Sequence, residues 1–160
     1  MKKTGPSDDI RTQQKVFDQA AIRDVLEKYF YGLDRRDFAA LADCFTSDAY
    51  GEYDGGKTIH VGREAIIEAL RGITQFTFST HLPGSTMIDV DRDRAKTETT
   101  GVAFLVVDEG GDKGRILVRG LRYIDDFVKT PEGWRICHRV HIPIWQYEVV
   151  SVPPGLPQVK

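Results

Sequence analysis

Three long strand-like segments occupy the second half of the chain, and they restrict the possible folds more than any other feature of the sequence. They span residues 96–107, 115–128 and 134–147, and two shorter strand-like segments, 76–82 and 86–90, precede them. The gaps between the segments hold residues typical of turns, such as Pro-Gly and Gly-Gly pairs. Because long antiparallel strands joined by short turns twist and curl, this pattern predicts one curled sheet.

Helical spacing is confined to the first half of the chain. Apolar residues recur at intervals of three and four over residues 17–33, which predicts a helix with one buried face. A second, short helix fits residues 37–45, where Asp37 can cap the first turn, and a third fits residues 63–73. Between them, two short strand-like runs flank a glycine-rich hairpin signal at residues 54–56.

Helices early and strands late predict an α+β fold rather than a parallel, doubly wound sheet. We expect a curled sheet of mixed or antiparallel strands that forms a cone, closed by three helices from the N-terminal half. Concave, mostly apolar spaces of this kind are where small ligands bind. A chain of 160 residues fits one such domain. We place it at residues 16–148, between a flexible, polar leader at 1–15 and a proline-rich arm at 149–160.

Composition and charge argue against several classes of function. The 22 basic and 24 acidic side chains give a formal charge of −2, which does not favour a nucleic-acid partner. No apolar run approaches the roughly 18 residues that span a bilayer, so we expect no membrane insertion. The polar start is not a secretory signal, and Cys44 and Cys137 alone make neither a disulfide framework nor a zinc pattern. We therefore expect a cytoplasmic protein without a metal or another cofactor.

Asp34 stands at the end of the apolar stripe of the first predicted helix. It follows Phe30 by four residues and therefore lies near the buried edge of the helix rather than opposite it. The alternative role is that of a helix-end carboxylate paired with Arg35 or Arg36.

His81 ends a strand-like segment, in which it shares one face with Ser79 and Thr77. This arrangement fits a half-polar strand that lines a cavity, and it fits an ordinary exposed strand equally well. On a later strand, Arg119 and Tyr123 are four residues apart and also share a face, from which both can donate hydrogen bonds into a cavity. The alternatives are a solvent-facing strand arginine for Arg119 and ordinary core packing for Tyr123.

Several short motifs, in their order and spacing, resemble the SnoaL-like group of the nuclear-transport-factor-2-like superfamily. The resemblance covers about residues 17–147. It is carried by Tyr29-Phe30-Tyr31-Gly32-Leu33-Asp34, Asp48-Ala49, Thr80-His81, Tyr123-x-x-x-Phe127 and Glu132-Gly133-Trp134-Arg135-Ile136. It implies that the predicted cone is a cystatin-like α+β barrel.

The resemblance also implies a site. Scytalone dehydratase, bile-acid 7α-dehydratase and hexachlorocyclohexane dehydrochlorinase hold an Asp–His dyad at the bottom of the cavity, and Asp34 and His81 occupy the matching positions. Tyr29 matches a helix tyrosine of the bile-acid enzyme, and Tyr53 matches a first-strand tyrosine of the scytalone enzyme. The catalytic candidates are thus Asp34 and His81, and the substrate-binding candidates are Tyr29, Tyr53, Arg119 and Tyr123.

The sequence departs from these enzymes at two positions. Leu105 stands near the place of the scytalone enzyme's second catalytic histidine, and Pro143 stands near the place of the bile-acid enzyme's late-strand arginine. Both departures argue against those two particular substrates. His60, His138 and His141 receive no role from the sequence.

The candidate dyad predicts proton-transfer chemistry. An imidazole is largely a free base at neutral pH, and a carboxylate on one ring nitrogen presents the other nitrogen to a substrate. We expect a cofactor-independent lyase of the dehydratase type, which acts on a small, ring-containing hydrophobic substrate. An isomerase or a polyketide-cyclase-type enzyme can use the same dyad. The class of non-catalytic proteins also stays open, either as a ligand-binding protein or as a structural protein like the β subunit of ring-hydroxylating dioxygenases.

One strand predicts association between copies of the chain. Val102, Phe104 and Val106 alternate with Ala103, Leu105 and Val107, so both faces of this strand are apolar. With one face in the cone and the other against a second chain, the pattern predicts a homodimer or a homotrimer.

Overall fold

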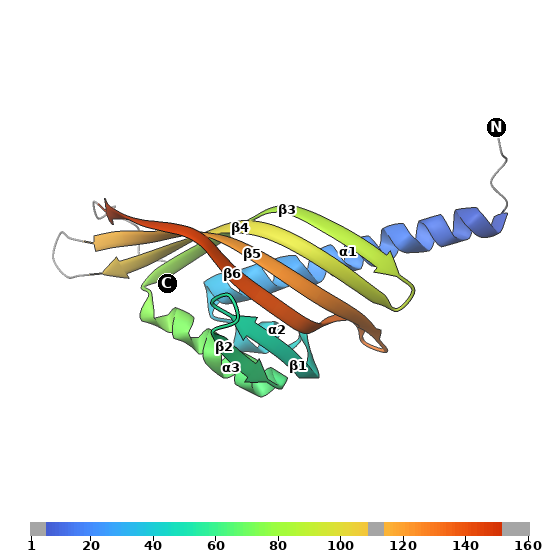
Figure 1. Ribbon diagram of the computed structural model, residues 1–160, viewed down its shortest axis with the longest axis horizontal. Coiled ribbons are helices and arrows are strands. Elements are labelled where there is room, and N and C mark those ends of the chain that lie inside the picture. Colours follow the sequence, from blue (N-terminus) through green and yellow to red (C-terminus); the bar gives the residue numbers. More distant parts are fainter. Residues whose placement is uncertain (1–5, 109–113, 152–160) are drawn as a thin grey trace.

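The computed structural model describes residues 6–108 and 114–151, and the side chains from residue 10 onward. A long helix and a short helix come first, then a small hairpin, a third helix and four long strands (Figure 1). In chain order the elements are α1 (Pro6–Arg35), α2 (Phe38–Ala42), β1 (Phe45–Tyr53), β2 (Thr58–Val61), α3 (Arg63–Leu70), the 3₁₀ helix η1 (Arg71–Gln75), β3 (Phe78–Asp91), β4 (Arg94–Asp108), β5 (Gly114–Thr130) and β6 (Gly133–Ser151).

The strands form one six-stranded sheet in the order β2-β1-β6-β5-β4-β3. All neighbours are antiparallel except β1 and β6, which run parallel. The helix α1 packs against β3 and β6, while α3 packs beside β1 and β2 (Figure 1). The predicted α+β fold, with a mixed sheet and three helices from the N-terminal half, is confirmed. The sheet does not close into a barrel, because β2 and β3 remain its two edges.

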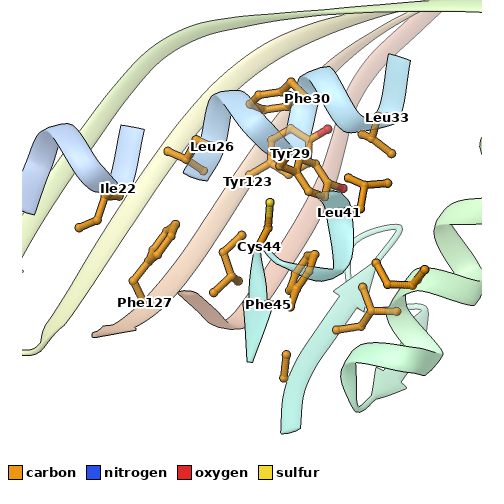
Figure 2. Close-up of a cluster of buried hydrophobic side chains, with 14 of the residues drawn as sticks. Ile22, Leu26, Tyr29, Phe30, Leu33, Leu41, Cys44, Phe45, Tyr123 and Phe127 are labelled. Atoms are coloured by element: carbon orange, nitrogen blue, oxygen red, sulfur yellow. The ribbon is translucent and has the colours of Figure 1, made fainter. Parts of the chain in front are cut away.

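The apolar stripe of α1 forms one wall of the core. Ile22, Leu26 and Leu33 are buried there, together with the rings of Tyr29 and Phe30 (Figure 2). Removing a large apolar side chain from water contributes about 1.5–3 kcal/mol, so this stripe holds the helix on the sheet. The opposite wall consists of residues from β1, β5 and β6, namely Phe45, Tyr123, Phe127, Trp134 and Ile136.

The helix α1 begins at Pro6, so residues 6–15, which the sequence analysis assigns to a leader, are helical. Proline is favoured at the first position of a helix because its fixed φ suits the helix and its missing N–H would have no partner. Residues 10–17 are exposed, and Phe17, the predicted start of the apolar stripe, is 68% exposed. The side chains of this part of the helix are exposed, so no buried face and no apolar periodicity marks it.

The strand β3 runs through the turn that the sequence predicts at Pro83-Gly84. Pro83 pairs with Gly101 and Thr86 pairs with Thr99, so one extra residue of β3 bulges out and the pairing with β4 continues beyond it. Proline is tolerated here because β3 is an edge strand. The predicted segments 76–82 and 86–90 are therefore one strand.

Three other boundaries differ from the sequence analysis. Asp37 does cap α2, accepting a hydrogen bond from the backbone N–H of Ala40 at 3.0 Å, but Phe45 belongs to β1 rather than to the end of that helix. The predicted third helix is split into α3 and η1. The strand β6 extends to Ser151, into the predicted arm, whose residues 152–160 lie outside the described residues. Within the described ranges, no helix is long and apolar enough to cross a membrane.

The predicted association between copies depends on the outer face of the sheet. Ala103 and Leu105 are buried on the inner face of β4, whereas Phe104 points outward and is only partly buried. On the same outward face, Phe78 and Leu82 of the edge strand β3, which pair with Val106 and Val102, are more than half exposed. We expect sedimentation velocity at micromolar concentration to give a dimer or trimer of the 18.1 kDa chain, and Leu82→Ser to shift it toward the monomer. A monomeric wild-type protein would contradict this prediction.

Candidate active site

Asp34 lies in the last turn of α1, and its carboxylate faces β3. Asp34 Oδ1 lies 2.7 Å from His81 Nδ1 and accepts a hydrogen bond from Ser79 Oγ at 2.9 Å. Asp34 Oδ2 accepts a hydrogen bond from the backbone N–H of His81 at 2.8 Å. The His81 side chain is 7% exposed and that of Asp34 is 23% exposed. A single carboxylate therefore holds both the backbone and the ring of His81.

Asp34 is ionised at neutral pH. Burial raises the pKa of this carboxyl, but the hydrogen bonds from the His81 ring, the His81 backbone and Ser79 outweigh burial, and the pKa lies below its ordinary value. An ionised carboxylate only accepts hydrogen bonds, so in a neutral His81 ring the proton is on Nδ1. The lone pair of Nε2 is then free to accept a proton from a bound molecule.

Arg36 directly follows the end of α1 and lies next to this pair. Its φ is 58°, and the backbone N–H of Asp37 donates to the carbonyl of Gly32 at 2.9 Å, as in a Schellman motif. Glycine is the usual residue at this position because a side chain is strained there. The Arg36 guanidinium offsets that strain by donating hydrogen bonds to the carbonyls of Leu33, Asp34 and Phe76 and to Ser79 Oγ.

Neither arginine after Asp34 forms an ion pair with its carboxylate. The Arg36 guanidinium is taken up by the contacts above, and Arg35 lies over the ring of Tyr31, with Cζ 4.2 Å from the ring centroid. In the described part of the chain, the partners of the Asp34 side chain are on β3. Asp34 is therefore not a simple helix-end carboxylate paired with Arg35 or Arg36.

His81 lines a pocket of about 270 Å³ between α1, the α3–η1 segment and the inner face of the sheet. All four predicted substrate-binding residues line the same pocket, whereas Asp34 lies behind His81. The remaining walls are mostly apolar and include Leu33, Ala69, Leu70, Ile73, Phe76, Ala103, Leu105 and Leu121. Asp54, Ala69, Gly72 and Gln75 are exposed and mark the rim. The buried lining residues are Tyr29, Leu33, Ala103, Leu105, Leu121 and Tyr123.

Three tyrosines form the polar part of the floor. Burial raises the pKa of Tyr29, and it raises the pKa of Tyr53 and Tyr123 well above the ordinary value. All three are therefore neutral phenols at physiological pH and can donate a hydrogen bond. The rings of Tyr29 and Tyr123 meet edge to face, with centroids 6.1 Å apart, which fixes the positions of both.

A buried ion pair, which the sequence does not predict, lies beside the tyrosines of the pocket floor and supports them. Arg139 of β6 and Asp125 of β5 are both 0% exposed and form two hydrogen bonds of 2.7 Å. The Arg139 guanidinium lies over the Tyr29 ring, 4.0 Å from its centroid. Burial opposes the charge, but Asp125 outweighs it and keeps the pKa of Arg139 well above its ordinary value. The alternation of Tyr123, Asp125 and Phe127 is the sequence signal for an inward carboxylate that needs a cationic partner.

His141, to which the sequence assigns no role, also lines the pocket. Its ring centroid lies 5.3 Å from that of Tyr123 and 5.5 Å from that of Tyr53. Burial, and then the positive charge of Arg139, lower the pKa of His141 to about 4. The ring is therefore neutral at physiological pH.

The other two unassigned histidines lie away from the pocket lining. His138 Nε2 is 2.9 Å from Glu52 Oε1, and His138 Nδ1 is 3.5 Å from Asp126 Oδ2. His60 packs against the ring of Tyr53, with centroids 5.7 Å apart. Among the residues described, no group of three or more His, Cys, Asp or Glu side chains is arranged to hold a metal ion.

Comparison with known sequences identifies relatives over most of the chain. Residues 14–140 match the family described as SnoaL-like domain. Uncharacterized proteins of Mycobacterium tuberculosis and Mycobacterium bovis are 33% identical over 133 residues, which are 82% of this chain and 89% of each relative.

Solved structures show the same fold. A hexachlorocyclohexane dehydrochlorinase from Novosphingobium barchaimii superposes with a TM-score of 0.77 at 16% identity, covering 89% of this chain and 99% of that one. A protein provisionally named scytalone dehydratase, from Novosphingobium aromaticivorans, gives 0.73 at 25% identity, covering 92% and 99%. A nuclear-transport-factor-2-like protein with a cystatin-like fold, also from Novosphingobium aromaticivorans, gives 0.73 at 20% identity, covering 89% and 92%. The group resemblance inferred from the motifs is thereby confirmed.

The lowered pKa of His141 predicts a specific pH dependence of stability. The unfolded chain binds a proton to His141 near pH 6.5 but the folded protein binds it only near pH 4, so stability falls as the pH drops between these values. Over this range the wild type should lose about 3 kcal/mol more of its free energy of unfolding than His141→Gln, measured in urea. An NMR titration in which the His141 ring titrates near 6.5 would contradict this expectation.

Proposed function

This chain belongs to the SnoaL-like domain family, and from that premise we propose that it is a cofactor-independent lyase. In this proposal it eliminates water or halide from a small, ring-containing and largely apolar substrate. One observation carries the proposal: Asp34 holds the backbone and the ring of His81, and His81 lines a pocket with both apolar walls and hydrogen-bond donors. This is the arrangement that a general base needs in order to take a proton from bound carbon.

The first step is removal of a proton from a carbon next to a carbonyl or a leaving group. The C–H bond breaks, the proton goes to His81 Nε2, and the electron pair forms the new double bond. Asp34 keeps its charge and stabilises the imidazolium that forms. The leaving group departs with its own electron pair, as halide, or as hydroxide that takes the proton back from His81 and leaves as water.

The tyrosines stabilise the negative charge that develops on the substrate. Tyr29, Tyr53 and Tyr123 line the same pocket as His81 and are neutral donors. Donors that are fixed before the reaction, in a site with few waters, stabilise a developing oxyanion without having to reorganise. Arg139 stacks on Tyr29 and makes that phenol a better donor than it would be beside apolar side chains.

Two of the structural neighbours support the class of reaction. Their names are those of a dehydrochlorinase, which removes hydrogen and chloride, and of a dehydratase, which removes water. Both names describe eliminations. Isomerisation is a second candidate because His81 can return the same proton to a different carbon when no leaving group is present.

The general-base role of His81 is testable with a panel of cyclic β-hydroxy ketones and hexachlorocyclohexane. Elimination is measured by the absorbance of the enone product or by the release of chloride. Isomerisation is detected by NMR as a shifted double bond. We expect His81→Ala to lower the rate by about 100-fold or more, because positioned proton transfer contributes at least that much. Asp34→Asn should also lower it strongly, since the amide favours the wrong tautomer of His81.

His138→Ala is the matched control, because His138 contacts Glu52 and Asp126 and does not line the pocket. It should leave the rate unchanged. An unchanged rate in His81→Ala would rule out His81 as the base. A wild-type protein that binds members of the panel but converts none would favour the non-catalytic ligand-binding alternative.

A further inference from the structure

We infer that the substrate of this pocket is a ring compound that carries an anionic group, a carboxylate or an equivalent oxyanion, and that Arg119 binds this group while His81 takes the proton. The inference rests on the proposed function in so far as it takes this pocket as the substrate site. It adds the chemical class of the substrate, which the Asp34–His81 pair alone leaves open.

Arg119 lines the pocket and forms no ion pair with any residue that the structure describes. Its Nε is buried and has no hydrogen-bond partner among those residues. A guanidinium that is partly removed from water and left unpaired is unfavourable. The nearby Arg139 also has one buried nitrogen, Nη1, without a hydrogen-bond partner, but its charge is matched by Asp125 through two hydrogen bonds.

The charges around Arg119 leave its positive charge uncompensated inside the pocket. The Asp34 carboxylate is occupied by His81 and Ser79, and Asp54, which also lines the pocket, is exposed at the rim and forms no ion pair with Arg119. His141 is held neutral, since burial and the charges of Arg139 and Arg119 lower its pKa and outweigh the charge of Asp54, which raises it. An anion on the ligand is the missing counter-charge.

The sheet places Arg119 and His81 at a fixed separation. His81 of β3 pairs with Ala103 of β4, and Ala103 pairs with Arg119 of β5, so the three side chains stand in one row on the inner face. Neighbouring strands are about 4.8 Å apart, which puts the backbones at His81 and Arg119 about 10 Å apart. Ala103 in the middle is small and leaves room for a ligand. The buried Leu105 and Leu121 supply an apolar surface beside this row.

This row fits a molecule with an anionic group at one end and an acidic C–H bond at the other. A carboxylate matches the planar guanidinium, because two parallel N–H···O hydrogen bonds can form. The pocket volume of about 270 Å³ is at the small end of the range for ligand pockets, which favours a small molecule. The inferred substrate is therefore a small cyclic carboxylate rather than a large neutral ring system.

Binding of benzoate, with benzamide as its uncharged isostere, tests the inference without knowledge of the true substrate. We expect calorimetry or NMR titration to show that the wild type binds benzoate about tenfold or more tightly than benzamide. Arg119→Gln should abolish this preference and leave benzamide binding unchanged, while Arg119→Lys should retain part of it. Thermal unfolding of both variants establishes that they fold.

Arg122→Gln is the matched control, because Arg122 lies on the same strand, is exposed on the opposite face and pairs with Glu98. It should keep the preference for benzoate, and so should His81→Ala. Equal binding of the two probes, no benzoate binding at millimolar concentration, or a benzoate preference that survives in Arg119→Gln would each overturn the inference. Elimination of a neutral substrate that depends on His81 but not on Arg119 would overturn it as well, and would leave the proposed function standing.

Discussion

The geometry of the candidate site depends on one carboxylate that joins the end of a helix to the edge of a sheet. Asp34 uses one oxygen for the backbone of His81 and the other for the His81 ring and Ser79. The strand β3 has a neighbouring strand on one side only, so the end of α1 provides the support that another strand would otherwise give. Arg36 adds to this support, because it binds carbonyls at the helix end and Ser79. The ring of His81 is thereby held in one position and one tautomer before any ligand binds.

The two arginines of the pocket region have different physical roles because their surroundings differ. Arg139 is fully buried, pairs with Asp125 and stacks on Tyr29, so its charge is fixed and matched within the protein. Removing one partner of such a pair leaves a buried charge unmatched, which costs about 3–5 kcal/mol, so the pair acts as a rigid support. Arg119 lines the cavity, forms no ion pair with a described residue, and is available to a ligand. The matched charge of Arg139 can hold the tyrosine donors in place, whereas the unmatched charge of Arg119 favours binding of an anionic ligand.

Local sequence patterns were sufficient to predict most of the helices and strands and part of the candidate site. The apolar stripe of α1, the shared face of Arg119 and Tyr123, and the order of the short motifs are all visible in short stretches of sequence. They predict residues that line one pocket. Residues 6–15 were missed because an exposed helix carries no apolar period, and the bulge in β3 was missed because Pro83-Gly84 is also a good turn. Arg139 and His141 were missed because the direction of their side chains depends on how β6 pairs with β5, which no local pattern contains.

The pairing of β6 explains why its inward residues could not be read from alternation. Trp134 and Ile136 are both buried, so strict alternation would turn residue 138 inward and residue 139 outward. Between the pairs Phe127–Ile136 and Asp126–His138, β6 contains one extra residue, Cys137, and this bulge reverses the alternation. Arg139 and His141 consequently face the pocket side, and His138 faces Glu52 on the other side of the sheet. A single extra residue thus decides which cation supports the tyrosines and which histidine joins them, and so it sets the electrostatic character of the cavity beside His81.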